Sequence, residues 1–108
     1  METFYIKRGD TSPAIRYALS PATVDLTGAT VQFQMRARRP RGGPPVIDAV
    51  AVVVTATGTP TVEYQWQDGE TANAGEYQAE FEVTYANGKT ETFPNDEFIL
   101  VKIAEDVR

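Results

Sequence analysis

The sequence predicts an all-β fold, an antiparallel β-sandwich of about seven to eight strands. Several short segments alternate apolar and polar residues, which is the pattern of a strand with one buried face. Glycine and proline breakers separate these segments at the spacing expected of a sandwich or barrel. No stretch has a helical period long enough to compete with this interpretation.

The clearest strand runs from Gly75 to Ala86, where every second residue is apolar. Asn87-Gly88 comes next and is the pair best able to adopt the positive φ angles of a type I′ turn. The polar and aromatic segment from Thr90 to Phe93 follows. These three features predict a β-hairpin.

Two further segments alternate in the same way, residues 29–38 and residues 62–67. Val46 to Thr55 is more uniformly apolar, which is typical of a strand covered on both sides or of one whose outer face meets a partner. Other strands are expected at residues 3–8, 14–19 and 98–103. The Arg-, Pro- and Gly-rich residues 38–45 are expected to form one long, mobile hairpin loop.

Composition narrows the function classes. The chain has 108 residues, which predicts one domain spanning residues 1–108. It has no Cys and no His, so it lacks a thiolate nucleophile, an imidazole base and the usual zinc ligands. We therefore expect no enzymatic activity, no small-molecule substrate, no cofactor and no metal.

A net charge of −5 disfavours nucleic acid as a partner. No apolar run is long enough to span a membrane, and the amino terminus lacks the pattern of a signal peptide.

Residues 73–79, Asn-Ala-Gly-Glu-Tyr-Gln-Ala, resemble the D-x-G-x-Y-x-C stretch of immunoglobulin domains. The resemblance implies an immunoglobulin-like sandwich in which the Tyr77 hydroxyl bonds back to the preceding corner of backbone. Ala79 takes the place of the cysteine, which is compatible with folding in a reducing cytosol. The core is expected to include the aromatic residues Trp66, Phe33 and Phe81.

Four motifs extend the comparison over nearly the whole chain. They are Gly-Asp-Thr-Ser-Pro at 9–13, Asp-Leu-Thr-Gly-Ala-Thr-Val at 25–31, Gly-Glu-Tyr-Gln-Ala-Glu-Phe at 75–81 and Asn-Gly-Lys-Thr-Glu-Thr-Phe-Pro-Asn at 87–95. Together they resemble the amino-terminal domain of phage baseplate upper proteins and related small virion proteins of tailed bacteriophages. The resemblance implies a structural tail, baseplate, head-tail or decoration protein, made in the cytoplasm of the bacterial host and incorporated into the virion. Its expected partners are other virion proteins and further copies of itself in a homo-oligomer.

The candidate partner-contact loop contains the basic cluster Arg36, Arg38, Arg39 and Arg41. A solvated hairpin tip is the simpler interpretation. If the loop does bind, a protein partner is favoured, because the acidic chain lacks the broad basic face of a nucleic-acid binder.

Other candidate sites have simpler structural interpretations. The alternative function is a free-standing binding module that recognises host cell-surface polysaccharide through an aromatic platform. The residues of this platform would be Tyr5, Tyr17, Tyr64, Tyr85 and Trp66. Core packing is the better explanation of these aromatic residues. The tripeptide Arg8-Gly9-Asp10 is interpreted as a turn rather than an adhesion motif. Turn capping rather than calcium binding is expected of Asp25, Asp68, Glu70, Asp96 and Glu97. Glu80 and Glu82 share an exposed strand face, where nothing would desolvate them for glycosidase chemistry.

Overall fold

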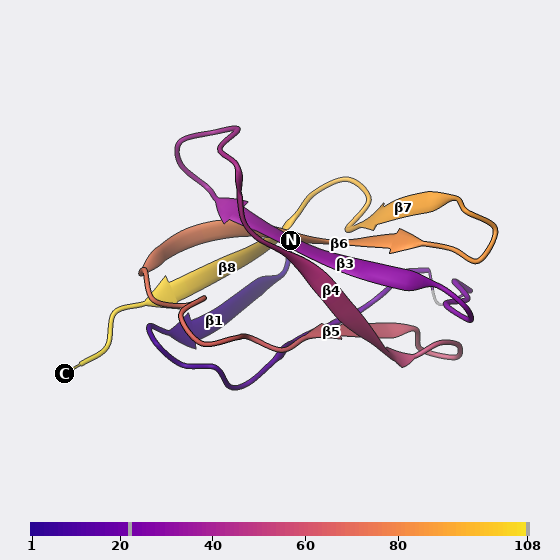
Figure 1. Cartoon of the computed structure of the whole chain (residues 1–108), viewed down its shortest axis with the longest axis horizontal. Helices are drawn as coiled ribbons and strands as arrows, with labels where there is room; N and C mark the ends of the chain where they lie inside the picture. Colours follow the sequence, from indigo (N-terminus) through magenta and orange to yellow (C-terminus); the bar gives the residue numbers. More distant parts are fainter. Residues whose placement is uncertain (22, 108) are drawn as a thin grey trace.

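The computed structural model describes residues 1–21 and 23–107, and these residues form β-strands and loops (Figure 1). The eight strands of this part are β1 (Thr3–Lys7), β2 (Ile15–Ala18), β3 (Thr30–Ala37), β4 (Pro45–Thr55), β5 (Thr61–Tyr64), β6 (Gly75–Thr84), β7 (Thr90–Phe93) and β8 (Ile99–Ala104). Across the described ranges no helix is long and apolar enough to cross a membrane. The predicted all-β class and the predicted strand positions are confirmed to within a few residues.

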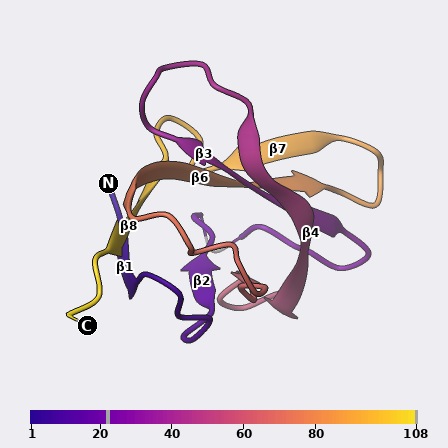
Figure 2. The same ribbon diagram turned by 60° about the vertical axis from the view of Figure 1, so that its left-hand side comes forward.

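The strands form one mixed sheet in the order β1-β8-β6-β3-β4-β5-β2, with β7 paired to part of β6. β4 joins the two parts of the sheet, because its residues up to Ala51 pair with β3 and those from Val52 onward pair with β5. Figure 2 shows β4 running from the layer of β3 and β6 toward the level of β2. The sheet is therefore curled into a nearly closed, barrel-like shape around its inner face.

The prediction of a purely antiparallel sheet is wrong at one edge. β1 lies parallel to β8, with Thr3 opposite Leu100 and Lys7 opposite Ala104. Almost the whole chain separates these two strands, so no tight turn forces them into opposite directions. The other strand pairs are antiparallel, as expected.

The inner face of the curled sheet is filled by aromatic and aliphatic side chains. Phe33 lies at its centre, stacked on Tyr64 at 4.6 Å between ring centroids and 5.1 Å from Phe81. Trp66 meets Phe33 edge-on at 5.8 Å. These four residues are at most 4% exposed, so alternate residues of β3, β5 and β6 do point into the core as the sequence pattern predicts.

Trp66 lies just beyond the strand to which its alternation with Tyr64 assigned it, because β5 ends at Tyr64. The Glu70 carboxylate accepts hydrogen bonds from the Tyr64 hydroxyl and, at 2.7 Å, from the Gln67 backbone N–H. Those contacts close a turn directly after Trp66. The indole N–H of Trp66 donates to the Pro13 carbonyl oxygen at 3.1 Å, so the buried ring is still held without a strand partner.

The hairpin of β6 and β7 is confirmed, but the predicted type I′ turn is wrong. The φ angle of Asn87 is not positive, whereas Gly88 has φ of 88°. The Gly88 N–H donates to the Tyr85 carbonyl oxygen, and the Tyr85 N–H donates to that of Lys89, both at 2.8 Å. This is a three-residue connection that closes with a glycine in the left-handed conformation.

Candidate docking surface

The basic cluster lies at one end of the β3–β4 hairpin. Arg36 is near the end of β3, where the register with β4 shifts between Met35 and Arg36. The connection that follows, residues 38–44, is here called the arginine loop. In Figures 1 and 2 this loop stands away from the body of the molecule. The structure therefore places Arg38, Arg39 and Arg41 on the protruding loop, whereas Arg36 belongs to the sheet.

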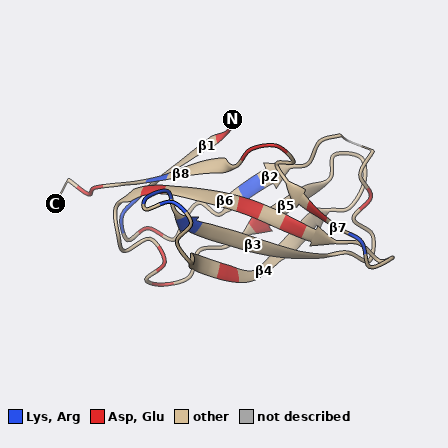
Figure 3. Cartoon of the chain, turned by 90° about the horizontal axis from the view of Figure 1, so that it is seen from above, with Lys and Arg blue, Asp and Glu red and all other residues tan. Residues whose placement is uncertain are grey.

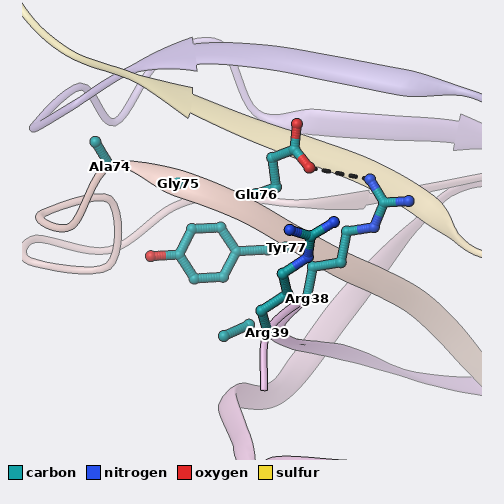
Figure 4. Close-up of a pocket in the computed structure, with 7 residues that line it drawn as sticks. Arg38, Arg39, Ala74, Gly75, Glu76 and Tyr77 are labelled. Carbon is teal, nitrogen blue, oxygen red and sulfur yellow. Dashed lines mark hydrogen bonds and ion pairs between the residues drawn. The ribbon is translucent and has the colours of Figure 1, made fainter. Parts of the chain in front are cut away.

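Arg38 anchors the base of the arginine loop. Its guanidinium group donates to the Glu76 carboxylate at 3.0 Å, and its backbone N–H donates to the Glu76 carbonyl oxygen at 3.0 Å. The Lys102 amino group lies 3.6 Å from the same carboxylate. The hydrogen bond from Arg38, aided by the charge of Lys102, holds the pKa of Glu76 below its ordinary value. Figure 4 shows this ion pair on one side of β6.

The remaining arginines are available for a partner. Arg36, Arg39 and Arg41 are exposed, and none forms an ion pair with another part of the chain that the structure describes. A shallow hollow beside the loop is lined by Ala37, Arg38, Arg39, Ala74, Gly75, Glu76 and Tyr77 (Figure 4). In this hollow Tyr77, the buried tyrosine of the predicted corner, lies next to the arginine loop.

The outer face of β4 is the second exposed feature, and it is uncovered. Its valines are 57%, 74%, 60% and 42% exposed at Val46, Val50, Val52 and Val54. We call these four residues, with Asp48 between them, the outer β4 face. For Val46 to Thr55 the sequence left open a strand covered on both sides or a strand whose outer face meets a partner. The first of these interpretations is wrong for the described residues. The reason is that the sheet curls around its other face, where Ile47 and Ala51 are buried.

The four residues assigned to the corner and core are structural. The Tyr77 hydroxyl donates to the Asn73 carbonyl oxygen at 2.7 Å, which is the backbone contact that the immunoglobulin resemblance implies. Phe33, Phe81 and Trp66 lie in the central cluster and reach neither the arginine loop nor the outer β4 face. Because Tyr64 and Trp66 are only 4% and 2% exposed, they cannot form an open platform for a sugar.

The other candidate sites are turns or open surface. Arg8 lies 3.8 Å from Glu105, and the backbone N–H of Asp10 donates to the Lys7 carbonyl oxygen at 3.1 Å, so the Arg-Gly-Asp segment closes a turn after β1. The Asp25 carboxylate accepts from the Thr27 N–H at 2.9 Å, as a turn-capping residue does.

No group of three or more His, Cys, Asp or Glu residues that could hold a metal ion occurs among residues 1–21 and 23–107. Glu80 and Glu82 project from the open side of β6, since the alternate residues Ala79, Phe81 and Val83 are buried on the inner side.

No protein-family model matches the chain, and no curated protein has a similar sequence. The function is therefore inferred from the geometry and from the sequence motifs. The structure offers a protruding cationic loop and an uncovered apolar strand face, both of which are features of a surface that meets another macromolecule.

Proposed function

We propose that the chain is a non-enzymatic structural component of a tailed-phage particle that acts through self-assembly and docking to other virion proteins. The observation that supports an assembly role is the uncovered outer β4 face. Burying one valine side chain completely contributes roughly 1.5 kcal/mol or more. A strip of four valines on one strand is thus a substantial driving force for association.

The fold is proposed to be an immunoglobulin-like sandwich. The contact between Tyr77 and Asn73 at the beginning of β6 supports it, as does the division of β4 between β3 and β5. A structural role in a phage particle is supported by the four sequence motifs, whose turn and core residues resemble those of baseplate upper proteins. Gly28 and Gly88, one in each of two of these motifs, have left-handed φ angles of 75° and 88°.

The experiment is quantitative peptide mass spectrometry of particles purified from the host strain that carries the gene. Isotope-labelled reference peptides from this chain give its copy number relative to the major capsid protein. We expect the chain in mature particles at the constant ratio of a ring or lattice component. Nuclease-treated lysate without particles serves as the control for contamination. Absence from mature particles would contradict the proposal.

The alternative, a binding module for host polysaccharide, is less well supported, since Tyr64 and Trp66 of its five-residue platform are buried while Tyr5 is exposed. A glycan panel gives an independent check on it. Titration of the purified chain with host polysaccharide is expected to leave its sedimentation and its intrinsic fluorescence unchanged.

A further inference from the structure

The outer β4 face has a definite chemical pattern across three strands. Register places Val50 beside Gln32 and Gln32 beside Glu82 in one row. The next row has Asp48 beside Gln34 and Gln34 beside Glu80. Neighbouring strands lie about 4.8 Å apart, so the β6 carboxylates lie roughly 10 Å from the β4 valines. The face is an apolar strip of exposed valines bordered on one side by acidic residues. Figure 3 shows the acidic residues on β4 and β6 in red.

These carboxylates have no cationic partner within the chain that the structure describes. Asp48 accepts a hydrogen bond from the Gln32 amide at 3.0 Å, and neither Glu80 nor Glu82 forms an ion pair. Arg36 lines a hollow together with Glu80, yet the two side chains do not form an ion pair. We call Asp48, Glu80 and Glu82 the acidic strip. These carboxylates are open to a cationic group from another molecule.

The arginine loop has the complementary character. Arg39 and Arg41 are exposed and form no ion pair with the described residues, and Pro40 lies between them in the sequence. The loop projects at one end of the sheet, as Figures 1 and 2 show, rather than over the acidic strip. Arginine stems and proline rings can cover apolar surface while the guanidinium groups bind carboxylates.

We infer that the outer β4 face receives the arginine loop of a second copy of this chain, an inference that rests on the proposed assembly function. Pro40 and the stems of Arg39 and Arg41 pack on the valines of the neighbouring copy. The guanidinium groups pair with its Glu80, Glu82 and Asp48. Each copy contributes a different surface to the contact, so an open row of copies has a free loop at one end and a free face at the other. Such a head-to-tail contact repeats and closes into a ring or extends as a filament.

Charge favours a second copy in this orientation. The chain carries a net charge of −5, so two copies repel each other over most of their surfaces. Three of its ten Lys and Arg residues, Arg38, Arg39 and Arg41, lie in the arginine loop. The arginine loop is thus the surface through which one copy can approach the acidic strip of another.

The test uses the purified full chain and charge reversal, with sedimentation velocity from low to high micromolar concentration. We expect wild type to associate reversibly, and more weakly at high salt because the charges are screened. A loop variant, Arg39→Glu with Arg41→Glu, and a strip variant, Glu80→Arg with Glu82→Arg, are each expected to weaken association at least about tenfold. An equimolar mixture of the two variants is expected to associate again, as is the chain that carries all four substitutions.

Matched controls change the net charge equally at exposed positions elsewhere. Lys7→Glu with Lys89→Glu corresponds to the loop variant, and Asp68→Arg with Asp96→Arg corresponds to the strip variant. These controls are expected to associate like wild type, and circular dichroism checks that every variant is folded. Val50→Asp is expected to weaken association without changing the fold, because Val50 is 74% exposed.

A wild-type chain that stays monomeric, or a mixture of loop and strip variants that does not associate, would overturn the inference. Association that resists both charge reversals but is lost in Val50→Asp would also overturn it, because the valines would then meet a different surface. Failure here is distinct from failure of the proposed function, which is read from the copy number in particles. A chain present in particles and monomeric in solution refutes the loop contact alone.

Discussion

The hydroxyl of Tyr77 donates a hydrogen bond of 2.7 Å to the backbone carbonyl oxygen of Asn73, four residues earlier. Tyr77 is a buried residue of β6, whereas Asn73 lies in the exposed turn that precedes this strand. The bond therefore fixes that turn to the sheet. Glu76, the neighbour of Tyr77, holds the base of the arginine loop through Arg38. The corner thus positions the candidate contact loop as well as the strand.

Tyr77→Phe tests the contribution of this bond. The ring stays in place and the hydrogen bond is lost, so we expect the free energy of unfolding to fall by about 1 kcal/mol. Urea unfolding followed by circular dichroism measures the change. Tyr5→Phe is the control, because Tyr5 is 67% exposed and its hydroxyl makes no hydrogen bond to the described chain. Equal stability of Tyr77→Phe and wild type would argue against a structural role for the corner bond.

Phe33→Ala tests the central position of Phe33. Its ring contacts Tyr64, Trp66 and Phe81, and it is fully buried. Removal of such a ring costs about 3–5 kcal/mol through lost burial and the cavity left behind. Val107→Ala, at a position that is 92% exposed, is expected to leave stability unchanged.

Trp66 provides the readout, since its fluorescence reports the same cluster. In wild type we expect a blue-shifted emission that acrylamide quenches poorly, and in Phe33→Ala a lower urea midpoint by the same signal. Efficient quenching of native wild type would contradict the burial of Trp66 against Phe33.

Alternation of side chains was enough to predict most of the strands and much of the core. Phe33 and Phe81 alternate with polar residues and are buried opposite each other across β3 and β6. The motif around Tyr77 predicted the backbone contact at the beginning of β6. These features depend on residues close together in sequence, where local periodicity carries the information.

The features that the sequence did not reveal depend on distant parts of the chain. The parallel pairing of β1 with β8 joins the two ends of the sequence, which no local pattern specifies. The direction in which the sheet curls decides that Val50 is exposed and Ala51 buried, although both lie in one apolar run. The basic cluster could be located from sequence, but the lack of ion pairs for Arg39 and Arg41 depends on the positions of the acidic residues.

Tyr85 is expected to make stability depend on alkaline pH. Burial, together with a hydrogen bond of 2.7 Å to Glu91 and the charge of that carboxylate, raises the pKa of Tyr85 to about 12. The unfolded chain has a tyrosine pKa of about 10. Because the folded value is the higher one, the stabilisation is fully present below about pH 10 and is lost as the pH rises toward about 12. Tyr85→Phe is expected to lose less stability than wild type over that range.

Urea unfolding at about pH 8 and about pH 11 measures this difference. Glu91→Gln is the informative second variant, since loss of the carboxylate charge should lower the pKa of Tyr85. The tyrosinate absorbance titration of this variant is then expected to shift to lower pH than that of wild type. If Tyr85→Phe loses as much stability as wild type between these two pH values, the assignment of the alkaline loss to Tyr85 is contradicted.

Gly28 and Gly88, two of the four glycines in the sequence motifs, should differ in their tolerance of a side chain. Gly88 has φ of 88° and open space where a Cβ would lie, so Gly88→Ala carries conformational strain alone and should cost about 1 kcal/mol. Gly28 has φ of 75°, and a Cβ there would lie 3.2 Å from the Cβ of Ala86 in the hairpin connection. Gly28→Ala should therefore lower the urea midpoint further than Gly88→Ala. Gly43→Ala, at a position without a left-handed φ and with its nearest atom at 3.5 Å, is the control and should be close to neutral. A larger loss in Gly88→Ala than in Gly28→Ala would show that the turn at Gly28 does not pack against the hairpin connection in solution.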